Sequence, residues 1–188
     1  MDIQDAKNLG FKLIGQFLNR ADYHLTFDQA TARCGACRTL YGPDGQVKRN
    51  RKGILGEIIL STRFIQNNSL AEVEDTIRHE IAHALCNARH GRIKGFDGKY
   101  ESHGLTWKKV AMEVGAKPRS CADVYIPKFY QLICSNPKCG GYKKKQSETN
   151  NPPKQGHYYP CKYCKSKLDM IPNSGGQIRA GVGLVEYF

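Results

Sequence analysis

The segment TIRHEIAHALCNARHG, residues 76–91, is rich in side chains that can bind a metal ion or transfer a proton. This segment contains the pattern H-E-x-x-H, formed by His79, Glu80 and His83. Side chains four residues apart on a helix point in nearly the same direction, so the two histidines can bind one metal ion. Glu80 would lie beside that ion, where it could take a proton from a zinc-bound water and later return it to a leaving amine. The pattern therefore predicts a catalytic zinc site.

A catalytic zinc site needs a third protein ligand, and the spacing alone leaves several residues open. His90 is the nearest candidate. A metzincin, however, requires a glycine and a histidine where this chain has Cys86 and Arg89. A thermolysin-like site would use a downstream glutamate instead. The candidates further along the chain are Glu101, Glu113 and His103.

A second set of metal-binding residues consists of four cysteines in two pairs. Cys134 and Cys139 form the first pair, and Cys161 and Cys164 form the second. Four thiolates arranged in this way are typical of a closed, tetrahedral, structural zinc site. The surrounding segment has few apolar residues and cannot build a core of useful size, so it needs a metal to fold. We therefore expect two zinc ions per chain, one catalytic and one structural.

The pair Cys34-x-x-Cys37 has no matching pair nearby. Such a pair could be redox-active or form half of a metal site. Because it falls in a predicted strand, we interpret it as two small buried side chains. The sequence shows no secretory signal, so disulfides are not expected.

The secondary structure that must position these residues follows from hydrophobic spacing. Residues 3–19 have the spacing of a helix with one buried face. Three segments are predicted to form a short antiparallel sheet: residues 23–28, 32–42 and 54–61. The basic segment 47–53 is predicted to be a loop.

The active-site helix is expected to begin near Leu70, because Ser69 and Glu72 match a capping box. Gly91 is a suitable residue for its end. A further helix is expected from about residue 103, closed by Gly115 and Pro118. These elements predict three segments: a first domain over residues 1–128, a zinc ribbon over 129–172 and a glycine-rich tail over 173–188.

The chain is strongly basic, with 29 lysines and arginines against 17 acidic residues and a formal net charge of +12. Such an excess favours attraction to a polyanion, most simply nucleic acid. Lysines interleaved with tyrosines suit phosphate contacts and base stacking. The candidate nucleic-acid contacts are Tyr142, Lys143, Lys144, Lys145, Lys162, Tyr163, Arg49, Arg51, Lys52 and Arg92.

Three segments together resemble the SprT-like (Spartan-related) zinc metalloprotease family. They are HEIAHAL at residues 79–85, HGLTW at 103–107 and the preceding GEIILSTRFI at 56–65. The resemblance covers roughly residues 5–121, and zinc ribbons also occur in this family. It implies an α+β, zincin-like metalloprotease domain followed by a small zinc ribbon with four cysteine ligands. It further implies that His79, His83 and His103 are the zinc ligands, that Glu80 is the catalytic base, and that Trp107 packs beneath the metal.

The function implied by this resemblance is that of a zinc-dependent endopeptidase associated with DNA, which cleaves DNA-bound or DNA-crosslinked proteins. Two alternatives stay open: a non-catalytic, zinc-dependent nucleic-acid-binding protein, and a protease unrelated to DNA. Glu80 argues against the first, because a purely structural site has no use for a base. The expected partners are DNA and proteins on DNA. We expect a monomer without a membrane span, located in the cytoplasm or on the nucleoid.

Overall fold

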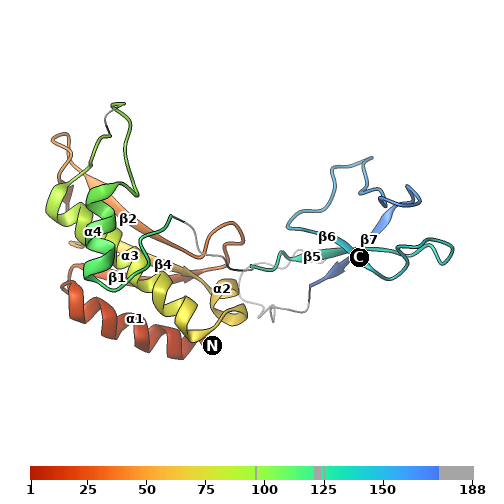
Figure 1. Cartoon of the computed structure of the whole chain (residues 1–188), viewed down its shortest axis with the longest axis horizontal. Helices are drawn as coiled ribbons and strands as arrows, with labels where there is room; N and C mark the ends of the chain where they lie inside the picture. The colour runs from red at the N-terminus through yellow and green to blue at the C-terminus, as the bar shows by residue number, and fades with distance from the viewer. Residues whose placement is uncertain (96, 121–123, 125, 174–188) are drawn as a thin grey trace. The chain divides into compact units, whose positions relative to one another are not determined.

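The computed structural model describes residues 1–95, 97–120, 124 and 126–173. The chain divides into two compact units, Met1–Ile126 and Pro127–Phe188. The predicted mixture of α and β structure is confirmed (Figure 1). The assignment of a protease domain and a zinc ribbon to these parts remains a proposal. The glycine-rich tail predicted over residues 173–188 lies, apart from Asn173, outside the described residues.

The first unit contains four helices and a four-stranded sheet within its described residues. The helices are α1 (Ile3–Phe17), α2 (Thr62–Asn67), α3 (Leu70–His90) and α4 (Leu105–Glu113). The strands are β1 (Tyr23–Asp28), β2 (Gly35–Tyr41), β3 (Val47–Lys48) and β4 (Gly56–Ser61), in the spatial order β1-β4-β2-β3.

The direction of one strand pair differs from the prediction. β2 runs antiparallel to β4, as expected, but β1 runs parallel to β4. β2 also pairs antiparallel with β3, whose residues Val47–Lys48 begin the segment 47–53 that was predicted to be a loop. The segment between β3 and β4 returns to the start of β1, where the N–H of Leu55 donates to the carbonyl of Asp22. β4 can therefore enter between β1 and β2 in the direction of β1. Hydrophobic alternation records which face of a strand is buried but not its direction, so the predicted all-antiparallel sheet was wrong.

Helix α3 carries the H-E-x-x-H pattern and lies at the centre of this unit. It contacts α1, α4, β2 and β4. Ser69 and Glu72 form the predicted capping box, and the helix ends at Gly91, which has a φ of +64°. Val73, Ile77 and Ile81 recur every four residues along α3 and are completely buried. Burial of these side chains fixes the rotation of α3 and so the direction in which its polar face points.

The second unit is a small antiparallel sheet with a minimal core. Its strands are β5 (Tyr130–Cys134), β6 (Lys145–Thr149) and β7 (Leu168–Pro172), with β5 in the middle. The buried residues of its core are Leu132, Leu168, Cys134, Cys139 and Cys161. Three of these five are cysteines, which agrees with the expectation that this segment cannot fold around apolar side chains alone. Among the described residues of the whole chain, no helix is both long and apolar enough to cross a membrane.

Candidate metal centres

Three histidines point their Nε2 atoms at one point in the first unit. His83 Nε2 lies 3.2 Å from His79 Nε2 and 3.0 Å from His103 Nε2, and the third side of the triangle is 3.2 Å. A tetrahedral zinc ion with bonds of about 2.0–2.1 Å requires ligand nitrogens about 3.3 Å apart. The nitrogens thus have the spacing of three ligands of one ion, and these residues form one of the groups able to hold a metal.

The third histidine reaches this point from the segment between α3 and α4. After Gly91 the chain forms a short hairpin in which Glu101 N–H donates to Ile93 O and Gly95 N–H donates to Lys99 O. The hairpin returns the chain to the polar face of α3, directly before α4. Ser102 Oγ lies 3.1 Å from His103 Nδ1, so it can fix the orientation of the imidazole.

Other residues considered as the third ligand are not part of this group. His90 is the last residue of α3, and Glu113 forms an ion pair with Arg89. Glu101 lies against Gly104 at the start of α4. The structure therefore brings together the three histidines implied by the family resemblance.

Trp107 packs against all three histidines. Its ring centroid lies 4.7 Å from that of His79, 5.0 Å from His83 and 4.6 Å from His103. The indole is 2% exposed, so it forms an apolar floor under the candidate metal centre. Rings held in this way lose little conformational freedom when a metal binds, because their orientation is already set by packing.

The electrostatics of the site favour metal binding over protonation of the imidazoles. Burial, together with the neighbouring imidazoles, lowers the pKa of His83 to about 3 and that of His79 to about 4. Burial also lowers the pKa of His103. All three side chains are thus neutral near pH 7, and a neutral imidazole is the form that donates its lone pair to a metal.

Glu80 is nearly buried beside this group, with 6% of its surface exposed. Burial raises the pKa of its carboxyl to about 8, and the positive charge of Arg33 and a hydrogen bond from the Cys37 N–H oppose the rise. Gly35 of β2 leaves room for this side chain. A Cβ at that position would lie 3.0 Å from Glu80 Oε1 and 3.1 Å from the Ile59 carbonyl. Sequence reasoning missed the contribution of β2, because no local pattern marks Gly35 or Arg33.

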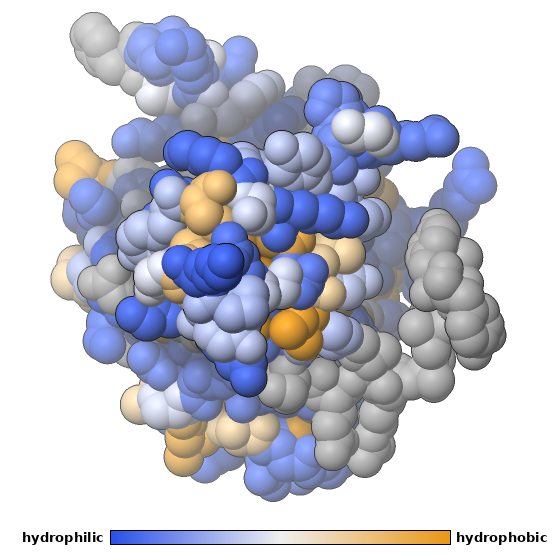
Figure 2. All heavy atoms as spheres, turned by 90° about the vertical axis from the view of Figure 1, so that its right-hand side faces the viewer, coloured by the Kyte–Doolittle hydropathy of each residue, from blue (hydrophilic) through white to orange (hydrophobic). Residues whose placement is uncertain are grey.

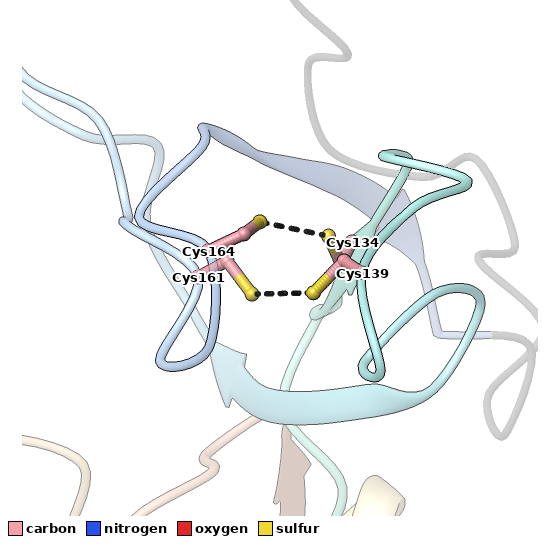
Figure 3. Close-up of side chains that lie close together, drawn as sticks. All are labelled: Cys134, Cys139, Cys161 and Cys164. Carbon is pink, nitrogen blue, oxygen red and sulfur yellow. Dashed lines mark hydrogen bonds between the residues drawn. The ribbon is translucent and has the colours of Figure 1, made fainter.

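The second candidate centre is formed by the four predicted cysteines (Figure 3). Cys134 Sγ lies 3.8 Å from Cys164 Sγ, and Cys139 Sγ lies 3.7 Å from Cys161 Sγ. Zinc–sulfur bonds of about 2.3 Å in a tetrahedron require sulfurs about 3.8 Å apart. The donor set and its spacing both fit a zinc ion.

Hydrogen bonds to sulfur prepare one thiol of this second centre, Cys161, for a cation, whereas burial raises the pKa of Cys134 to about 12. The N–H groups of Gly141 and Tyr163 donate to Cys139 and Cys161, at 3.3 and 3.4 Å, and the Gln146 amide donates to Cys161 at 3.0 Å. Burial opposes ionisation of Cys161. Hydrogen bonds from main-chain N–H groups and from Gln146 outweigh it and lower the pKa of this thiol to about 6. Thiolates are the form that binds zinc.

The pair Cys34 and Cys37 is part of neither centre. Cys34 directly precedes β2 and Cys37 lies within it, so their Cα atoms are about 10 Å apart along an extended chain. A disulfide cannot bridge more than about 7 Å. Both side chains pack against the core, as the structural interpretation expected.

The aromatic residues predicted to contact nucleic acid lie on the two cysteine loops. Tyr142 is 37% exposed and Tyr163 is 58% exposed. Lys143 Nζ lies 5.2 Å from the Tyr142 ring, and Lys162 Nζ lies 4.8 Å from the Tyr163 ring. The Tyr163 ring packs over Gly141, where a Cβ would approach it to 2.6 Å. Figure 2, which turns the side of β5–β7 toward the viewer, shows a mostly hydrophilic face with small hydrophobic spots.

The predicted basic residues differ in what they contact. Lys144, Arg51 and Lys52 are exposed. Lys145 forms an ion pair with Glu148, and Arg49 bonds to Asp22 and to the Gly53 carbonyl. The Arg92 guanidinium stacks on Tyr100, 3.6 Å from the ring centroid, and lies 5.4 Å from that of Tyr41. Arg49 and Lys145 therefore have structural partners, and a nucleic acid would have to compete with them.

Comparison with known proteins adds independent information about the first unit. The SprT-like family matches residues 11–126. Protein SprT of Proteus mirabilis (strain HI4320) is 24% identical over 143 residues, which are 69% of this chain and 79% of that protein. No solved structure matches the chain.

The position of Trp107 yields a direct test of the three-histidine centre. Trp107 is the one tryptophan of the chain, and we expect Co²⁺ bound by the three histidines to quench its emission because the rings are in contact. Emission is measured during Co²⁺ titration of the metal-free protein, while thiolate-to-cobalt absorption follows the cysteine centre separately. The double variant Cys161→Ser/Cys164→Ser should retain the quenching. Unchanged emission at one bound Co²⁺ in that variant would argue against the three-histidine centre.

Proposed function

Because the chain belongs to the SprT-like family, a membership that indicates a metalloprotease-type role, we propose that it is a zinc-dependent endopeptidase associated with DNA. The observation that carries the proposal is the buried carboxylate of Glu80 beside three converging imidazoles. A purely structural metal site needs no such base, and burying a carboxyl group that can ionise costs free energy. We also propose that the unit Met1–Ile126 has a zincin-like arrangement.

The three histidines would hold the zinc ion, and Glu80 would serve as the general base. Zinc bound there supplies Lewis acidity, lowering the pKa of a water molecule and polarising a peptide carbonyl. In its ionised form, which the charge of Arg33 favours and that of a bound zinc ion would favour further, Glu80 accepts a proton from the attacking water and delivers it to the nitrogen of the leaving amine. The Cys37 N–H fixes this carboxylate against β2 during both steps.

The outer edge of β2 suits an extended polypeptide. Among the described residues, β3 pairs only with Leu40 and Tyr41, so the edge from Gly35 to Thr39 has no neighbouring strand. A substrate in extended conformation can add to such an edge through main-chain hydrogen bonds, which do not depend on its sequence. The bound chain would pass Glu80, because Gly35 lies against that side chain.

The association with DNA is supported by charge and by the second unit. The net charge of +12 attracts a polyanion and concentrates the enzyme on it. The paired Tyr142–Lys143 and Tyr163–Lys162 side chains provide rings for base stacking next to cations for phosphates. A protease held on DNA needs little sequence preference, because proximity selects proteins bound or crosslinked to the same DNA.

The substitution Glu80→Gln tests the enzymatic proposal. It keeps the size of the side chain but removes the base, so cleavage of a protein crosslinked to DNA should fall by at least about a hundredfold. Zinc content and thermal stability are measured on the same preparation to show that the centre survives. A variant that cleaves as fast as the wild type would instead favour the alternative of a non-catalytic nucleic-acid-binding protein.

The substitution Gly35→Ala tests whether β2 positions Glu80. The added methyl group would press on the Glu80 side chain and on the Ile59 carbonyl. A displaced base should lower kcat by about tenfold to hundredfold while the zinc content is retained. Gly15→Ala in α1 is the matched control, since its Cβ would meet only the flexible side chain of Arg20. Equal kcat values for the two variants would refute a positioning role for Gly35.

The two exposed tyrosines test the contact with DNA. Replacing both Tyr142 and Tyr163 by alanine removes the stacking surfaces, each worth about 1–3 kcal/mol per base. Affinity for single-stranded DNA should fall at least tenfold at fixed salt concentration. The double phenylalanine variant keeps the rings and should bind like the wild type. If the alanine variant retains wild-type affinity at several salt concentrations, the tyrosines do not contact DNA.

A further inference from the structure

The hairpin that follows α3 carries two cations on one exposed aromatic ring. The Arg92 guanidinium lies 3.6 Å from the centroid of the Tyr100 ring, and Lys94 Nζ lies 5.9 Å from the same centroid. All three side chains are exposed, and 54% of the Tyr100 surface is accessible. A ligand in solution can therefore reach both charges and the ring.

Main-chain hydrogen bonds fix the backbone from which these side chains project. The Arg92 N–H donates to the Gly45 carbonyl at 2.9 Å, in the turn between β2 and β3. Lys94 and Tyr100 lie opposite each other in an antiparallel bridge, which brings their side chains close together. The hairpin thus holds the two cations and the ring as one cluster before any ligand binds.

The positive charge of this cluster is not neutralised within the described part of the chain, where neither cation forms an ion pair. The acidic residues nearest in sequence have other contacts. Asp97 pairs with Lys99, the Asp44 side chain accepts the Gln46 N–H, and Glu101 lies against the start of α4. The distances to their shared ring keep the two cations closer together than the Debye length of about 10 Å at 0.1 M salt, so they repel each other. An anion bound between them would relieve this repulsion.

We propose that Arg92, Lys94 and Tyr100 form a second contact surface for single-stranded nucleic acid, separate from the tyrosines of the cysteine loops. This inference deepens the proposed association with DNA and rests on it. A guanidinium stacked on a ring keeps its in-plane N–H groups for two oxygens of one phosphate, and the lysine adds a second positive charge. The accessible part of the ring suits an unpaired base, which an acidic peptide does not have.

The position of this surface in the chain is relevant to the proposed protease. Tyr100 precedes His103 by three residues, so their Cα atoms are no more than about 11 Å apart. A strand bound at Tyr100 would pass close to the candidate three-histidine centre. Proteins crosslinked to that strand would thereby be brought near Glu80.

The test compares the double variant Arg92→Gln/Lys94→Gln with Lys7→Gln/Arg20→Gln. The control removes the same two charges from exposed residues that also lie over one aromatic ring, that of Phe11 next to α1 residue Lys7. Affinity for a fluorescent oligothymidylate is measured by anisotropy at several salt concentrations. Both changes are made in the wild type and in the Tyr142→Ala/Tyr163→Ala protein.

Arg92→Gln/Lys94→Gln should lower the affinity at least about tenfold at low salt. It should also reduce the slope of log affinity against log salt concentration by about 1.4, or about 0.7 for each lost phosphate contact. The control should leave that slope unchanged. Zinc content and thermal unfolding show whether each variant folds. If the double variant loses zinc, Lys94→Gln alone, a change at an exposed side chain, should still reduce the slope by about 0.7.

Equal losses in the two double variants would show that net charge alone matters and would overturn the inference. An equal loss of affinity for polyglutamate would also overturn it, in favour of a surface for acidic proteins. A wild-type protein that binds no oligonucleotide would refute both this surface and the proposed association with DNA. Binding that depends on Arg92 and Lys94 in a protein that cleaves nothing would refute the proposed protease and leave this inference standing.

Discussion

The convergence of three imidazole nitrogens to within 3.0–3.2 Å of one another is the constraint on which the first unit depends. Three neutral nitrogen lone pairs repel one another unless a cation lies between them. The surrounding packing must therefore hold them in place: α3 is fixed by its buried stripe, and the hairpin after Gly91 returns His103 to the same point. Trp107 then closes the centre from below. The packing that forms the fold therefore also positions the three histidines.

The second unit follows the same physical logic with different ligands. Its apolar core is too small to hold three strands together, and its cysteines take the place of missing hydrophobic side chains. The N–H groups that point at sulfur lower the cost of keeping thiolates in a buried position. Each of the two cysteine loops carries an exposed tyrosine beside a lysine: Tyr142 with Lys143, and Tyr163 with Lys162. A metal that joins the two loops would thus also hold these two tyrosine–lysine pairs together.

Sequence reasoning was most successful where the relevant residues are local. The spacing of His79 and His83 predicts a shared helix face, and Ser69 and Glu72 predict the start of α3; both arrangements are present. The spacing of the two cysteine pairs likewise predicts one four-cysteine group, and the structure brings the four sulfurs together. The third histidine is a different case, because spacing left several candidates open and only the family resemblance pointed to His103. Its position depends on a hairpin whose path has no simple sequence signal.

Contacts between distant segments explain what the sequence did not reveal. The parallel pairing of β1 with β4 depends on the return of the chain past Asp22. Gly35 and Arg33 belong to the surroundings of Glu80 only because β2 packs against α3. Nothing in the residues next to them marks either as special. The proposed role of Glu80 as a base thus depends on a strand that the H-E-x-x-H pattern does not include.

The proposed role of His103 is to complete a zinc centre separate from the cysteines. It is tested most directly by the zinc content of the wild type and of His103→Ala after dialysis against a weak chelator, measured by mass spectrometry. The account predicts two zinc ions per chain in the wild type and one in the variant, since two imidazoles bind zinc far less tightly than three ligands. Two retained zinc ions in His103→Ala would contradict it.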